Sequence, residues 1–123
     1  MNIRLAIIYG LQENATKAEE HLTKALNAKY EGAEVAQVYN AIGDIYQNSD
    51  KYDKAIDYFR KAEKSAKDPW DRSYAKLSIV FCYLQKRDND NAKKEAQELL
   101  KLPDLDADHK KMAEEILKYL SGG

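Results

Sequence analysis

Residues that break helices are scarce in this sequence. Only 5 of its 123 residues are glycine and 2 are proline, whereas alanine, leucine, lysine and glutamate are abundant. This composition favours helix throughout the chain. Cysteine is nearly absent, and with Cys82 alone no disulfide can form within the chain. We therefore expect an all-α protein in a reducing compartment, the cytoplasm.

Long apolar runs and an excess of one charge are also missing. The run from Ile79 to Leu84 is far too short to span a bilayer. Lysine plus arginine number 20 against 21 for aspartate plus glutamate, whereas a nucleic-acid-binding surface needs a basic surplus. The sequence contains no glycine-rich phosphate loop, no metal-ligand spacing and no nucleophile beside a base. These absences predict no membrane or nucleic-acid binding, no enzyme, no metal and no cofactor.

Apolar and small residues do recur, at intervals of 37 residues. The aligned sets include Tyr9, Tyr46 and Tyr83; Ala18, Ala55 and Ala92; Leu22, Phe59 and Ala96; and Leu5, Ile42, Ile79 and Ile116. Recurrence in several registers indicates a chain built from structural repeats.

Spacing within the middle unit is helical. Tyr39, Ile42 and Tyr46 share one helix face, Ala55 and Phe59 share another, and the turn-forming residues 48–50 separate the two. Asp68 followed by Pro69 is a typical helix start. We therefore predict antiparallel helix pairs, with helices at residues 2–11, 15–29, 34–48, 52–67, 69–86, 90–101 and 106–120.

The middle unit resembles a tetratricopeptide repeat, whose pattern is W-x2-L-G-x2-Y, then A-x3-F. The matching residues are Tyr39, Ile42, Gly43 and Tyr46, then Ala55, Phe59 and Ala62. Gly43 and Ala55 are small where two helices would cross closely, with Phe59 beside them. The third unit departs from the pattern, with Lys76 at the aromatic position and Val80 at the glycine position.

The resemblance implies a right-handed α-solenoid of about three helical hairpins in a single domain over residues 1–120. Its units would be residues 1–33, 34–68 and 69–104, followed by a capping helix at 105–120, with 121–123 as a disordered tail or a cloning remnant. The family period is about 34 residues. Whether the longer period of this chain lengthens helices or loops is left open.

In the family, the first helix of each pair lines a concave groove that receives a peptide or an amphipathic helix of another protein. Carried over by position, the groove residues are Ile3, Ile7, Gln37, Asn40, Asp44, Gln47, Tyr74, Leu77, Phe81 and Leu84. The same positions in the last helix are Lys111, Glu114 and Lys118. The resemblance thus implies an interaction scaffold of the adaptor or chaperone type.

The family's two-carboxylate clamp needs cations and amides at set positions. Here those positions hold Ile3, Ile7, Ala41, Tyr74 and Ser78, so we predict that this clamp is absent.

Two questions stay open at this point. The stripe of Tyr74, Leu77, Phe81 and Leu84 is either an exposed contact site or part of the core. The chain is either a holder of other proteins or a structural piece of a longer solenoid or of a homodimer. Trp70, next to a helix start, is predicted to staple the junction between units, and Asp104 to Asp108 to form the acidic start of the last helix.

Overall fold

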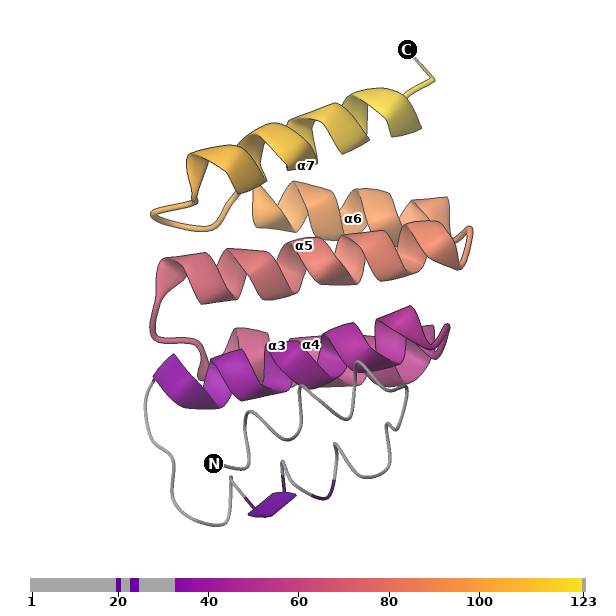
Figure 1. Ribbon diagram of the computed structural model, residues 1–123. Coiled ribbons are helices and arrows are strands. Elements are labelled where there is room, and N and C mark those ends of the chain that lie inside the picture. The colour runs from indigo at the N-terminus through magenta and orange to yellow at the C-terminus, as the bar shows by residue number, and fades with distance from the viewer. Residues whose placement is uncertain (1–19, 21–22, 25–32, 123) are drawn as a thin grey trace.

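The computed structural model describes residues 20, 23–24 and 33–122 (Figure 1). Within this part the chain forms five helices and no strand: α3 (Ala33–Asn48), α4 (Tyr52–Ser65), α5 (Pro69–Gln85), α6 (Asn89–Leu99) and α7 (Ala107–Leu120). Their ends lie within two residues of the predicted ones, and the all-α class is confirmed for these residues. The helix predicted at 2–11 lies outside the described residues, and of the one predicted at 15–29 only residues 20, 23 and 24 are described, all three of them helical. The count of seven helices and the 37-residue period therefore stay predictions. No described helix is long and apolar enough to cross a membrane.

The two turns that join paired helices close in the same way. Asp50 has a φ of 60° and Arg87 a φ of 63°, both in the left-handed region. In each turn the next residue's N–H donates back to a tyrosine carbonyl, from Lys51 to Tyr46 and from Asp88 to Tyr83, both at 2.9 Å. These bonds satisfy carbonyls that the helix end would otherwise leave unpaired.

The starts of α5 and α7 are capped by aspartate. Asp68 accepts a hydrogen bond from the backbone N–H of Trp70, and Pro69 is the first helical residue, as predicted. Asp106 accepts from the N–H groups of Asp108 and His109, so this acidic stretch does form a helix start. The caps determine where the chain enters each helix.

α3, α5 and α7 form one layer of the stack, and α4 and α6 form the other. The helices of the first layer lie closer together than those of the second. The α3 backbone lies close to that of α5, and α5 close to α7, whereas the backbones of α4 and α6 lie close to the first helices but not to each other. Figure 1 shows α3, α5 and α7 following one another along the stack. Among the described helices, the first helices of the pairs are thus closer together than the second helices. Such a stack curves toward α3, α5 and α7.

The main core lies where α3, α4 and α5 meet. Phe59 is fully buried there, beside Ile42, Ala55 and Ile79. A Cβ atom placed on Gly43 would lie 2.6 Å from the Phe59 ring, closer than real Cβ atoms approach any neighbour. This is the close helix crossing that the sequence predicts.

Two smaller clusters join α5 to α6 and α7. One contains Leu77, Leu99 and Ala113, and the other Val80, Ala92 and Ala96. Because Leu77 is only 5% exposed, most of its side chain belongs to this core. α7 is therefore held to the stack by apolar packing.

A buried ion-pair network joins α4, α5 and α6 at Lys76. Its ammonium lies 2.5 Å from Glu95 and 2.8 Å from Glu98, and Arg60 lies 2.6 Å from the other oxygen of Glu95. Burial alone would lower the pKa of Lys76, but hydrogen bonds to the two glutamates outweigh it and raise that pKa. Burial alone would raise the pKa of Glu95, but Lys76 and Arg60 lower it. Charge pairing thus occupies the place where the family pattern has an aromatic ring.

Candidate functional site

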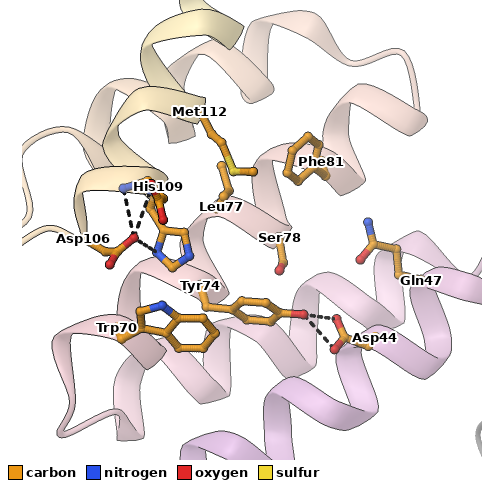
Figure 2. A pocket seen from close by; sticks show the side chains of 11 residues that line it. Asp44, Gln47, Trp70, Tyr74, Leu77, Ser78, Phe81, Asp106, His109 and Met112 are labelled. Carbon is orange, nitrogen blue, oxygen red and sulfur yellow. Dashed lines mark hydrogen bonds and ion pairs between the residues drawn. The ribbon is translucent and has the colours of Figure 1, made fainter.

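A pocket of about 380 Å³ opens on the side of the stack made by α3, α5 and α7. Its walls are Asp44 and Gln47 from α3; Trp70, Tyr74, Leu77, Ser78 and Phe81 from α5; and Asp106, Asp108, His109 and Met112 from the start of α7. Figure 2 shows the rings of Trp70, Tyr74 and His109 at one end of the pocket and Met112 and Phe81 at the other.

Aromatic rings form the first end of the pocket. Trp70 stacks on Tyr74 with ring centroids 5.2 Å apart and an interplanar angle of 20°, and lies 5.1 Å from the His109 ring. Trp70 is 48% exposed. Part of its ring is therefore open to the pocket, whereas the sequence predicted a side chain packed at the junction between units.

His109 anchors the start of α7 to α5. Its imidazole is buried, with Nδ1 2.5 Å from the Ser73 hydroxyl oxygen. That hydroxyl also donates to the carbonyl of Trp70 at 3.1 Å, so Nδ1–H of His109 is assigned as the donor to Ser73. The rings at this end are held in place before any ligand arrives.

Asp44 is the charged group on the α3 side of the pocket. The Tyr74 hydroxyl donates to both of its carboxylate oxygens, at 2.9 and 3.0 Å (Figure 2). Burial raises the pKa of Asp44, and the bond from Tyr74 offsets only part of that rise. Burial and the charge of Asp44 in turn raise the pKa of Tyr74 well above its ordinary value. Among the described residues, no lysine, arginine or histidine forms an ion pair with Asp44.

A second pocket of about 320 Å³ continues along α5 and α7. Phe81 and Met112 line both pockets, and Glu115, Ile116 and Tyr119 line the second one alone. Phe81 is 38% exposed, Met112 45% and Tyr119 75%. The two pockets thus form one groove, which we call the α5/α7 groove.

Five of the residues predicted for the groove come together in the first pocket: Asp44, Gln47, Tyr74, Leu77 and Phe81. The others are placed differently. Gln37 is exposed but outside both pockets, Asn40 is buried and donates to the Asp71 carbonyl at 3.4 Å, and Leu84 packs on the cluster around Val80. Ile3 and Ile7 lie outside the described residues. The apolar stripe of α5 is therefore divided, with Leu77 and Leu84 mainly packed in the core and Phe81 facing the groove.

The α7 side of the groove was misplaced by one residue. Lys111, Glu114 and Lys118 do not line it; Met112, Glu115 and Tyr119 do. α7 begins 38 residues after α5, one more than the interval used for the prediction. One residue turns a helix by about 100°, which is enough to move a side chain out of the groove. Ala75 and Ala113 are both fully buried and are also 38 residues apart. This spacing in the sequence was the signal that could have given the correct alignment of α7 with α5.

Trp70, Ser78, Asp106, Asp108 and His109 were not predicted as lining residues. For Trp70 a signal existed, since it lies four residues before Tyr74 on the same helix face. Asp106, Asp108 and His109 reach the pocket only because α7 packs against α5, which no local pattern indicates.

The described residues offer little reactive chemistry. No three or more histidine, cysteine, aspartate or glutamate side chains among them are grouped to hold a metal ion. Burial raises the pKa of Cys82 to about 12, so this thiol stays protonated at neutral pH and is a poor nucleophile. What the groove offers is exposed apolar surface bordered by carboxylates.

Comparison with known proteins agrees with this architecture. A family model described as tetratricopeptide repeat matches residues 1–68, which include α3, α4 and the Gly43–Phe59 contact. A search of curated proteins found no match. α5, α6 and α7 continue the same pairing beyond the matched range. Tetratricopeptide repeats generally mediate protein–protein interactions, and this chain belongs to the tetratricopeptide repeat family.

Proposed function

We propose that this protein is an interaction module, an adaptor or chaperone of the cytoplasm, that holds a peptide or helix of another protein in the α5/α7 groove. The observation that carries the proposal is the set of exposed apolar side chains along one continuous groove: Trp70, Phe81, Met112 and Tyr119. Contiguous exposed apolar surface rimmed by polar groups is typical of protein-binding sites. The free thiol of Cys82 supports a reducing compartment.

The energy available to a ligand is substantial. Fully burying one large apolar side chain contributes about 1.5–3 kcal/mol. The three half-exposed side chains of the groove, Trp70, Phe81 and Met112, therefore offer several kcal/mol before the cost of ordering the ligand is subtracted. The bonds from Tyr74 to Asp44 and from His109 to Ser73 hold the groove in shape, which lowers the reorganisation that binding requires.

An acidic C-terminal tail is a poor candidate for the ligand. Tyr74 and Ser78 occupy two of the positions where the family's clamp has cations, and both line the pocket. The charges next to them are the carboxylates of Asp44, Asp106 and Asp108, which repel a terminal carboxylate.

A double variant, Phe81→Ser with Met112→Ser, tests the proposal. We expect peptides selected from a displayed random library by the wild-type chain to lose at least tenfold in affinity for this variant, because two apolar contacts are removed. Both side chains are partly exposed, so the melting temperature should change little, whereas Leu77→Ser would disturb the core.

The matched control is Lys93→Ser with Gln97→Ser, two exposed residues of α6 away from the groove. This variant should bind like the wild type. Selected peptides that bind both double variants equally well would show that the α5/α7 groove is not the binding site.

Self-association is the second candidate, and the exposure of Tyr119 at the open end of the groove favours it. Sedimentation velocity over a range of concentrations separates the two. A dimer that the double variant abolishes would mean that the groove binds a second copy of this chain.

A further inference from the structure

The charged groups of the α5/α7 groove are of one sign. Asp44, Asp106 and Asp108 line the first pocket and Glu115 the second, and within the described residues no lysine or arginine lines either one. The whole chain is nearly neutral, with 20 basic and 21 acidic residues. The acidic groove is therefore a local arrangement and does not follow from an acidic composition.

Asp44 differs in its partners from Glu95, a buried acid of α6. Glu95 forms ion pairs with Lys76 and Arg60, whereas Asp44, among the described residues, accepts hydrogen bonds from a neutral group, the Tyr74 hydroxyl. Its raised pKa shows that the ionised form is disfavoured in the free protein. A cation supplied from outside would stabilise that form and relieve the cost.

The aromatic rings of the pocket favour a flat cation. Trp70, Tyr74 and His109 pack against each other with centroids 5.1 to 6.4 Å apart, which leaves no space between them for a quaternary ammonium group. The exposed half of Trp70 remains open to stacking. A guanidinium group lies flat on aromatic faces and binds carboxylates through two parallel N–H groups, whereas an ammonium group is a compact point charge without this planar geometry.

The apolar end of the groove lies next to these groups. Met112 and Phe81 are exposed beyond Tyr74 and Ser78, and both side chains continue into the second pocket (Figure 2). Methionine is flexible and adapts to ligands of different shape. A ligand that reaches Asp44 with a cation can therefore bury apolar side chains of its own against Phe81 and Met112.

We infer that the partner segment is basic and apolar: a peptide with an arginine whose guanidinium binds Asp44 beside Tyr74, and with apolar side chains that pack on Phe81 and Met112. This inference rests on the proposed function and specifies the partner's chemistry. It predicts a salt-sensitive complex, because part of the affinity comes from opposite charges.

The test uses peptides selected from a displayed random library by the full chain. Selected peptides should carry an arginine close to apolar residues. Replacing that arginine by citrulline, a neutral group of the same shape, should weaken binding to the wild type roughly tenfold, the effect of removing one charge-assisted pair. The same replacement should have little effect on binding to Asp44→Asn.

Asp44→Asn is a suitable variant because it should fold. The raised pKa means that ionised Asp44 opposes folding above that pKa, so a neutral amide should keep or raise the melting temperature at neutral pH. The matched control is Asp57→Asn, which removes the same charge from an exposed position of α4. It should bind arginine and citrulline peptides like the wild type.

The outcomes separate the two proposals. Selected peptides that are acidic or uncharged, or that bind Asp44→Asn as tightly as the wild type, would overturn the arginine inference. If those peptides still lose affinity for the Phe81→Ser, Met112→Ser variant, the groove remains the binding site. Peptides insensitive to every groove variant would overturn both.

Discussion

Gly43 shows how one residue sets the distance between two helices. Its missing Cβ leaves room for the fully buried ring of Phe59, which packs against the α3 backbone from α4. Two effects compete at this position. Alanine favours helix over glycine by about 1 kcal/mol, but added atoms in a packed core cost about 1–3 kcal/mol.

Packing should prevail in Gly43→Ala, because the new Cβ would lie 2.6 Å from a ring that is enclosed on all sides. We expect the free energy of unfolding to fall by about 1–2 kcal/mol in urea denaturation. The control is a double-mutant cycle with Phe59→Leu, whose smaller side chain should remove part of the clash. If Gly43→Ala is as stable as the wild type, the helices do not cross this closely.

At the scale of elements, the turns after α3 and α5 each place a residue with a Cβ in the left-handed region. Asp50 gains a bond there, since its carboxylate accepts from the Tyr52 hydroxyl at 2.9 Å. Arg87 is exposed and forms no ion pair among the described residues. The turn after α5 therefore retains strain that its side chain does not offset.

Arg87→Gly should relieve this strain and raise the free energy of unfolding by about 1 kcal/mol, because glycine adopts a φ of 63° without a steric penalty. Thermal and urea denaturation measure the gain. Arg87→Ala keeps a Cβ atom and should gain little. Equal stability of the glycine and alanine variants would contradict the assigned turn geometry.

At the scale of the whole molecule, the Lys76 network ties three helices together inside the stack. Lys76 and Glu95 are both buried, so removing either partner weakens the compensation of the charge that remains. Lys76 would still have Glu98 at 2.8 Å and Glu63 at 3.6 Å. We therefore expect the loss on breaking the pair to be smaller than for a fully isolated buried charge.

Glu95→Gln should lower the free energy of unfolding by about 2–3 kcal/mol at neutral pH. The folded pKa of Glu95 is below its ordinary value of 4.5, so its contribution is complete above that value and is lost as the pH falls through the folded pKa. The difference between wild type and variant should therefore shrink on acidification below about pH 4.5. A difference that is independent of pH would mean that charge is not its cause. Glu98→Gln, at the exposed edge of the network, is the control and should cost less.

The sequence by itself determined the parts of this protein that depend on near neighbours in the chain. The ends of α3 to α7, the Asp68 cap and the close crossing at Gly43 follow from helical spacing, capping chemistry and side-chain size. Asp44, Tyr74 and Phe81 could be placed in the groove through the resemblance to the tetratricopeptide repeat, whose pattern assigns their positions to it.

Only the tertiary structure decided which apolar residues are covered and which are left open. Leu77 is buried because Leu99 and Ala113 come from other helices to cover it, whereas Phe81, one turn later, meets no such neighbour. Trp70 and His109 meet across two helices, and the extra residue before α7 rotates that helix and turns Met112 toward the groove. Contacts between units depend on the length and direction of the connecting segments, which side-chain periodicity within one helix does not encode.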